Sequence, residues 1–313
     1  MHQVKLPLGG ALWMAASLLS FIGMAVAARE LSMFMSIFEI LFFRSFVGLI
    51  IISPVIYKQR AKLKQAQDLG LQVGRNAVHF AGQYAWTVGV ASLPLVKVFA
   101  LEFTTPIWVS LLAFLFLKEK LSTARVLAAI GGFIGVLVVL RPGFDSIEPA
   151  ALIVLLAAVG YATSIIMVKK LTLTSSPTLI VIWMVLLQLP LGFGLSLAQW
   201  RTPTLECIPW ILLLGITGLS AHFAMAKALN VMEASIAIPI DFFRVPLIAV
   251  VGFFLYSESL EIWVLVGALI IFASNYLSFR IEQRTEHPGM GDGPSRDKAA
   301  RAYDSGRCRN PNG

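Results

Sequence analysis

The chain has 313 residues, of which 58% are hydrophobic and 13% are charged, and its mean hydropathy is +0.80. Soluble globular domains carry about 25% charged residues, so this composition excludes a soluble domain and indicates an integral membrane protein. The formal net charge of +8 does not indicate a nucleic-acid partner, because so apolar a chain has no basic groove-facing surface to offer.

Apolar stretches long enough to cross a lipid bilayer, about 20 residues each, recur along the chain. Polar segments such as Tyr57 to Asp68 and Lys169 to Ser176 separate them. The sequence therefore predicts an all-α integral membrane protein with ten transmembrane helices. They are expected near residues 8–27, 33–56, 71–91, 95–117, 124–140, 149–168, 177–198, 209–231, 235–256 and 260–279.

The lysines and arginines between these spans are distributed unequally. Loops rich in lysine and arginine stay in the cytoplasm. If the N-terminus is cytoplasmic, the opposite side holds only Arg29, Arg141 and Arg201 in its loops, whereas the cytoplasmic loops and the tail hold many more. We therefore expect a multi-pass protein of the bacterial inner membrane with both termini in the cytoplasm.

Two apolar stretches, 96–121 and 235–260, resemble each other. When the second is laid on the first, Glu102 falls on Asp241. The surrounding halves, 8–140 and 149–280, each contain five predicted helices, and an odd number makes the second half enter the membrane from the opposite side. The sequence thus predicts two inverted five-helix repeats, a plan common among secondary transporters. Residues 281–313 are rich in Gly, Pro, Arg and Asp and are expected to form a disordered cytoplasmic tail.

In each of these two stretches a proline lies four residues after the acid or after the acid's immediate neighbour. Pro106 follows Glu102, and Pro246 follows Phe242, the neighbour of Asp241. A proline has no N–H, so the carbonyl four residues earlier is expected to be free of its helical partner. Free backbone acceptors at membrane depth are tolerated only inside protein or beside a water-filled cavity. We therefore expect both stretches to form walls of one substrate site.

Several ionisable residues lie deep within the predicted spans. A charge at mid-membrane costs at least about 2.5–3.5 kcal/mol, so these residues must face one another or a cavity. One interpretation is a set of internal ion pairs, such as Arg44 with Glu39 or Glu102, and Lys227 with Asp241. The other is a substrate site, and the two are compatible. Arg75, Lys97 and Lys227 lie nearer helix ends, where their side chains are expected to reach water.

Aromatic residues accompany these charges. Tyr84 and Trp86 lie in the third predicted span, Trp108 follows Glu102, and Phe243 follows Asp241. A pocket with charges of both signs and flat apolar walls suits an amphipathic or zwitterionic organic solute. The candidate cavity residues are Arg44, His79, Tyr84, Trp86, Glu102, Trp108, His222, Asp241, Phe243 and Arg244.

The two halves share features of a known family. Each fourth span ends in an acid-x-Leu turn, at Glu119 and Glu258, and each final span is rich in small residues, such as Gly131 and Gly135. This pattern resembles the EamA repeat of the drug/metabolite transporter superfamily. The resemblance implies transport of a small metabolite, for example one that is amino-acid-derived, S-adenosylmethionine-like or riboflavin-like. It also implies a cavity lined mainly by the third, fourth, eighth and ninth spans, with the first, second, sixth and seventh spans contributing.

The expected mode of transport is secondary. The sequence has no GxxxxGK[ST] stretch for nucleotide binding, so no ATP hydrolysis is expected. Glu102 and Asp241 are the candidates for proton coupling, while exchange or facilitated diffusion stay open. No cofactor or metal is predicted, because no His, Asp or Glu cluster has metal-ligand spacing and Cys207 and Cys308 lie far apart.

Two other classes of function stay open. They are an integral membrane enzyme that acts on lipid-linked substrates, and a passive pore. An enzyme of that kind is expected to carry catalytic acids or histidines in interfacial loops, which here are short. The expected partners are the solute and the lipid bilayer. A homodimer through Gly131 and Gly135 is possible in principle, although packing within one chain is the other use of such glycines.

Overall fold

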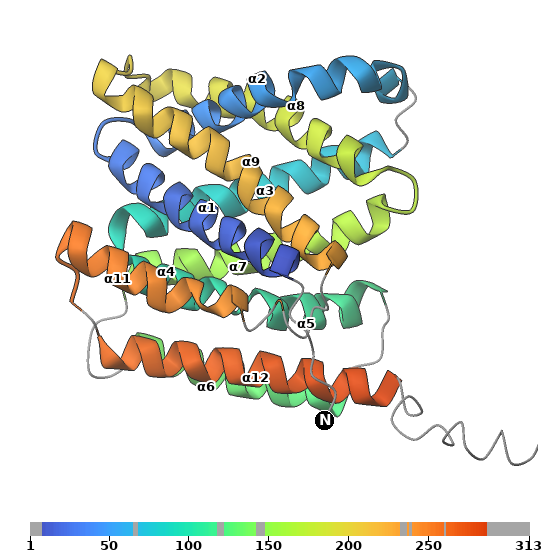
Figure 1. The fold of residues 1–313 in the computed structure, drawn as a ribbon, viewed down its shortest axis with the longest axis vertical. Helices are drawn as coiled ribbons and strands as arrows, with labels where there is room; N and C mark the ends of the chain where they lie inside the picture. The colour runs from blue at the N-terminus through green and yellow to red at the C-terminus, as the bar shows by residue number, and fades with distance from the viewer. Residues whose placement is uncertain are drawn as a thin grey trace, which may run out of the picture.

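The computed structural model describes residues 8–64, 68–117, 122–141, 148–231, 237, 240–259 and 261–286, and its regular structure in these ranges is helical. The first half contains α1 (Leu8–Ser32), α2 (Ile37–Lys64), α3 (Leu69–Ser92), α4 (Leu95–Glu102), α5 (Thr105–Leu117) and α6 (Thr123–Leu140). The second half contains α7 (Pro149–Leu171), α8 (Pro177–Ser196), the 3₁₀ turns η1 (Leu197–Gln199) and η2 (Leu205–Cys207), α9 (Ile208–Val231), α11 (Arg244–Tyr256) and α12 (Ile262–Glu286). Figure 1 shows their arrangement.

Eight helices within the described ranges are long and apolar enough to cross a membrane, so the predicted number of ten is not confirmed. The predicted third span corresponds to α3, which is long enough but carries buried polar side chains such as Gln72, Arg75 and Gln83. The predicted ninth span, 235–256, is described only in part, and its regular portion α11 has 13 residues. The first departure follows from the polar side chains that α3 buries inside the protein, and the second concerns a stretch that lies partly outside the described residues.

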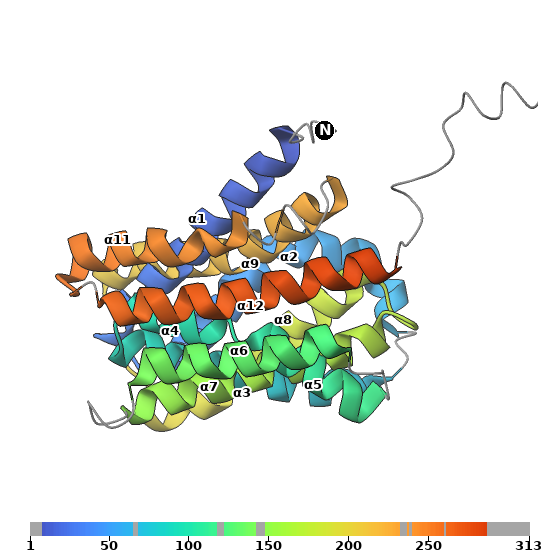
Figure 2. The same ribbon diagram turned by 90° about the horizontal axis from the view of Figure 1, so that it is seen from below.

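The two halves pack on each other with a matching set of helix pairs. α1 lies along α9, and α7, which holds the place of α1 in the second half, lies along α3. α2 pairs with its counterpart α8 at one end of the long axis, and α6 pairs with α12 at the other (Figures 1 and 2). An approximate twofold exchange of the two halves accounts for every one of these pairings.

Close approach of helices depends on glycine at two of these contacts. A Cβ on Gly160 would lie 3.3 Å from the Cα of Gly82, so glycine lets α7 approach α3 and brings the Tyr161 ring against Gly82. Between α6 and α12, a Cβ on Gly135 would lie 2.8 Å from the carbonyl oxygen of Gly267. Gly135 is therefore used for packing within the chain.

The predicted helix around Glu102 is broken at that residue. α4 ends at Glu102 and α5 begins at Thr105. Pro106 cannot donate to the Glu102 carbonyl, but the Thr105 hydroxyl donates to that carbonyl at 2.6 Å. The free acceptor expected from the sequence is thus occupied, because a hydroxyl next to the proline replaces the missing N–H.

The counterpart stretch is broken at the equivalent place. Asp241 and Phe242 are helical, Phe243 forms a turn, and α11 begins at Arg244. The ring of Phe103, next to Glu102, meets the ring of Phe242 edge-on at 5.6 Å. The two breaks therefore touch where the halves meet. Pro239 lies outside the described residues.

A polar cluster joins four segments at one end of the bundle. The Glu258 carboxylate accepts from Arg29 Nη2 at 2.6 Å and from the Leu95 backbone N–H at 2.8 Å. Arg29 also donates to the carbonyls of Val90 and, at 2.9 Å, Leu93. We call these residues the Arg29–Glu258 cluster. It ties the ends of α1 and α3 and the start of α4 to the segment after α11. Its repeat counterpart, the predicted turn at Glu119, lies outside the described residues.

The last helix is longer than predicted. α12 continues to Glu286, so residues 281–286 of the predicted disordered tail are helical. Glutamate, glutamine and arginine are good helix formers and extend the helix beyond its apolar stretch. Residues 287–313, the rest of the predicted tail, lie outside the described part of the chain.

Candidate functional site

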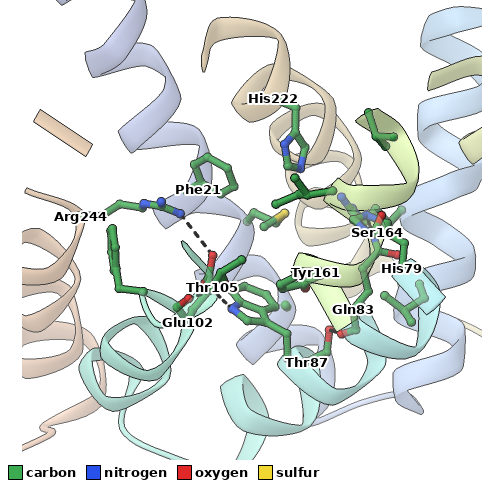
Figure 3. A pocket seen from close by; sticks show the side chains of 18 of the residues that line it. Phe21, His79, Gln83, Thr87, Glu102, Thr105, Tyr161, Ser164, His222 and Arg244 are labelled. Carbon is green, nitrogen blue, oxygen red and sulfur yellow. Dashed lines mark hydrogen bonds and ion pairs between the residues drawn. The ribbon is translucent and has the colours of Figure 1, made fainter. Parts of the chain in front are cut away.

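A cavity of about 780 Å³ lies between the two halves. Its lining comes from α1, α2, α3, α4, α5, α7, α9 and the break before α11, whereas α8 contributes none of the lining residues that the structure describes. The family resemblance implied a lining mainly from the third, fourth, eighth and ninth spans, which correspond to α3, α4 with α5, α9, and the segment around Asp241 and Arg244. These supply most of the lining residues that the structure describes, and α1, α2 and α7 supply the rest. The expected contribution of the seventh span, α8, is not observed. Figure 3 shows the side chains of part of this lining, among them Glu102, His79 and Arg244.

One end of the cavity is organised by Glu102. Its Oε2 accepts from Trp86 Nε1 at 2.7 Å, and its Oε1 lies 3.6 Å from Arg244 Nη1. Arg244 Nη2 donates to Asp241 Oδ2 at 2.5 Å. The guanidinium thus bridges the acids of the two repeats, because the helix breaks bring the end of α4 and the start of α11 together. We call Glu102, Asp241 and Arg244 the acidic end.

Aromatic rings surround Arg244. Its guanidinium carbon lies 4.2 Å from the centre of the Phe21 ring and 5.0 Å from that of Phe103. Phe99 lies slightly farther, at 5.7 Å. A cation over such ring faces is stabilised electrostatically, most strongly where water is excluded. Arg244 is therefore held in place by both its acids and its rings.

The other end of the cavity is lined by Arg44, Arg75, His79 and His222. Arg75 and His79 are one turn apart on α3, and Arg44 lies so close to α9 that a Cβ on Gly218 would be 2.7 Å from its Nε. His222 is one turn beyond Gly218 on α9. We call these four lining residues the basic end.

Neutral polar groups line the wall between the two ends. The Gln83 amide lies 3.1 Å from His79 Nε2, and the Thr87 hydroxyl donates to the Gln83 carbonyl at 2.8 Å. Tyr161 and Ser164 face them from α7. In Figure 3, Tyr161 lies between Glu102 on one side and His79 on the other. The wall therefore offers hydrogen bonds and a flat ring to a bound solute.

The structure brings most of the candidate cavity residues together. The lining includes Arg44, His79, Trp86, Glu102, His222, Asp241 and Arg244.

Three candidates lie elsewhere. Tyr84 stacks on Phe38 with ring centres 4.6 Å apart. Phe243 is 60% exposed, and Trp108 is half-buried outside the cavity lining. Aromatic residues next to a lining acid in sequence point elsewhere because a helix turns about 100° at each residue.

The internal ion pairs proposed from the sequence are not those of the structure. Glu39 accepts from the backbone N–H of Ser36 at 2.8 Å and of Arg201 at 2.7 Å, so it binds backbone groups instead of Arg44. Asp241 pairs with Arg244, and Lys227 lies over the Phe223 ring at 5.6 Å. The expected partner of Asp241, Lys227, was therefore wrong, because the partners of these charges depend on how the helices and their breaks pack.

Some lining residues were missed by sequence reasoning. Arg75 was expected to reach water but is only 8% exposed and lines the cavity. Gln83 and Thr87 were also missed, although with His79 they repeat at four-residue intervals along α3 and so share one face. That polar stripe was a usable signal. Tyr161 and Ser164 stand in an apolar span without such a pattern.

Comparisons with known proteins agree on one family. The sequence model of the EamA-like transporter family matches the chain twice, over residues 8–141 and 148–280. A riboflavin transporter of Brucella anthropi is 31% identical over 76% of this chain and 86% of its own length. A riboflavin transporter of Vibrio cholerae is 30% identical over 84% and 88%, and an S-adenosylmethionine uptake transporter of Rickettsia bellii is 27% identical over 83% and 89%.

The fold has a solved counterpart. A protein crystal structure matches with a TM-score of 0.61 over 88% of this chain and 98% of that chain. Its sequence identity is 14%, so the likeness concerns the fold alone.

Proposed function

This chain belongs to the EamA-like transporter family, and on that premise we propose that it is a secondary carrier that moves a small polar or amphipathic organic metabolite by alternating access. The observation that carries the proposal is the charged cavity between the two halves, lined by both broken helices. Solute sites of inverted-repeat transporters are built from such discontinuous helices. The five-helix halves are then inverted repeats that present the cavity to each side of the membrane in turn.

The shape and chemistry of the cavity support a metabolite as the solute. Ligand sites for drug-sized molecules enclose roughly 300–1,000 Å³, and this cavity of about 780 Å³ lies within that range. Its flat walls include Trp86 and Tyr161, and its polar groups carry charges of both signs. The relatives that are named as riboflavin and S-adenosylmethionine transporters suggest a solute with a heteroaromatic ring.

The Arg29–Glu258 cluster supports a two-state mechanism. It ties together the ends of helices that belong to both halves, so solute passage at that end requires these contacts to separate. With the N-terminus and the C-terminus in the cytoplasm of a bacterial cell, as the distribution of lysine and arginine favours, the cluster closes the side away from the cytoplasm.

The test is solute counterflow. Purified protein is reconstituted into proteoliposomes loaded with unlabelled riboflavin or S-adenosylmethionine, and entry of the same labelled compound is followed. A carrier produces transient accumulation of label above its equilibrium level. A passive pore produces simple equilibration, and an enzyme without transport activity produces no difference from protein-free vesicles. Either of the last two results, with a broadened panel of metabolites, contradicts the proposal.

A further inference from the structure

We infer that Arg44 and Arg75 form an oxyanion subsite that holds a carboxylate or phosphate group of the transported solute. The inference rests on the proposed carrier function and assigns a chemical requirement to one end of its cavity. It follows from how the charges in the cavity are paired, from where the two arginines lie, and from the cost of leaving them unpaired.

The arginines at the two ends of the cavity differ in their partners. Arg244 contacts both Glu102 and Asp241, so its charge is matched within the acidic end. Neither Arg44 nor Arg75 forms an ion pair with an acid in the part of the chain that the structure describes. The basic end therefore carries two positive charges without a protein counter-ion.

Arg75 is the more tightly enclosed of the two. It is 8% exposed, its Nη1 donates to the neutral Asn76 amide oxygen at 3.0 Å, and its buried Nε has no hydrogen-bond partner among the described residues. A buried polar atom without a partner costs about 1–3 kcal/mol, and more when the group is charged. An incoming oxygen atom would satisfy this donor.

Arg44 lines the same cavity as Arg75 and reaches it from α2. Its side chain packs against Gly218 of α9, where any larger residue would collide with its Nε. This contact fixes the stem of Arg44 across the cavity end from α3. Each guanidinium offers the fork of N–H donors that a carboxylate or a phosphate accepts.

Charge placed at membrane depth is expensive and is retained mainly where it binds a solute or an ion. At the acidic end, by contrast, the charge of Arg244 is matched by two carboxylates and a set of rings, although its buried Nε and Nη1 also make no hydrogen bond among the described residues. The absence of equivalent partners near Arg44 and Arg75, among the residues described, leaves the solute as the counter-ion.

The inference specifies how a solute lies in the cavity. Its oxyanion group contacts Arg44 and Arg75, a flat or apolar portion passes Tyr161, and any cationic or donor group faces Glu102. In Figure 3, Glu102 and His79 stand on opposite sides of Tyr161, which provides the separation that such an orientation needs.

The experiment uses two pairs of probes that differ only in the oxyanion. Flavin mononucleotide is riboflavin with a phosphate ester, and S-adenosylmethionine differs from its decarboxylated form by one carboxylate. Binding of all four compounds to the purified full-length protein in lipid nanodiscs is measured by calorimetry. The flavin pair reports on phosphate and the other pair on carboxylate. In at least one pair, the compound with the oxyanion should bind at least about tenfold more tightly.

Variants connect that preference to the two arginines. Arg44→Gln and Arg75→Gln should each remove most of the preference, whereas Arg44→Lys and Arg75→Lys keep the charge and should retain part of it. Lys227→Gln is the matched control, because Lys227 is an exposed cation on α9 outside the cavity lining. It should keep the preference unchanged. Thermal unfolding of each variant without ligand identifies any that fail to fold, and the lysine variants then decide.

Three results would overturn the inference. The first is equal or tighter binding of the compound without the oxyanion in both pairs. The second is an oxyanion preference that survives in a folded Arg44→Gln/Arg75→Gln double variant. The third is the failure of both oxyanion compounds to bind the wild-type protein. Counterflow of an uncharged solute that neither arginine variant affects would sink the subsite while leaving the proposed carrier function intact.

Discussion

At the scale of single residues, Glu102 is a carboxylate that contacts both halves of the chain. It accepts a hydrogen bond from Trp86 of its own half and lies beside Arg244 of the other half. Its side chain keeps a 21% exposed surface toward the cavity, so it remains within reach of water and solute. A carboxylate in that position can change partners when the halves move.

Replacing Glu102 by glutamine keeps the size of the side chain and removes its titratable proton. If Glu102 carries the coupling proton, the pH-dependent part of uptake into proteoliposomes should disappear in Glu102→Gln. Initial uptake rates between pH 5 and 8 measure the effect. Glu206→Gln, at an exposed acid in η2, is the control and should keep the wild-type profile. An unchanged pH dependence in Glu102→Gln excludes this residue as the proton carrier.

The indole of Trp86 allows a direct comparison with that of Trp108. Trp86→Phe keeps an aromatic ring but removes the donor to Glu102, and we expect a loss of roughly 1–2 kcal/mol in stability because the acceptor is charged. Trp108→Phe should cost less, because the buried Nε1 of Trp108 has no hydrogen-bond partner in the described structure. Denaturant or thermal unfolding in detergent measures both. Equal losses for the two variants would refute the role given to the Trp86 hydrogen bond.

At the scale of elements, the breaks at Glu102 and Phe243 place functional groups in the cavity. A continuous helix through Pro106 would lack one backbone hydrogen bond, and the structure instead ends α4 and starts α5 with a hydroxyl contact. Because two such breaks meet at the Phe103 and Phe242 rings, the acids of both repeats reach one site.

Thr105 tests how much this break depends on its side-chain hydrogen bond. Thr105→Val is nearly the same shape but leaves the Glu102 carbonyl without its donor, so stability should fall by about 1–3 kcal/mol. Thr105→Ser keeps the hydroxyl and should retain most of it. The apparent melting temperatures of the two purified variants provide the measurement. A valine variant as stable as the wild-type protein would show that the break does not depend on this hydrogen bond.

At the scale of the whole molecule, the two halves of the chain enclose the cavity and the Arg29–Glu258 cluster holds them together at one end. Its ion pair is largely buried, with side chains 18% and 9% exposed. By contrast, the pair formed by Lys97 and Glu148 includes a side chain that is 47% exposed. Exposed ion pairs such as that of Lys97 and Glu148 contribute little to stability, whereas removing one partner of a buried pair lowers stability strongly.

Opening of the cavity at the end held by the Arg29–Glu258 cluster should therefore change when Glu258 is replaced and not when Glu148 is replaced. The reporter is Ser164→Cys, a cysteine in the cavity wall of a chain whose two native cysteines are replaced. It is labelled with a membrane-impermeant maleimide that is added on the side of the Arg29–Glu258 cluster. Glu258→Gln should increase the labelling rate several-fold and lower stability by roughly 2 kcal/mol. Glu148→Gln should change neither by much. Unchanged labelling in Glu258→Gln would show that the cluster does not control access.

The sequence by itself determined the class, the repeat and most of the acidic end. Long apolar stretches require helices in lipid. The matching acids and prolines around Glu102 and Asp241 identified two walls of the cavity. Both inferences were possible because the internal repeat and the cost of burying a charge in lipid can be read from the chain alone. Only the tertiary structure decided which charges meet. The partners of Glu39 and the burial of Arg75 depend on how helices distant in sequence pack, and no local pattern encodes that.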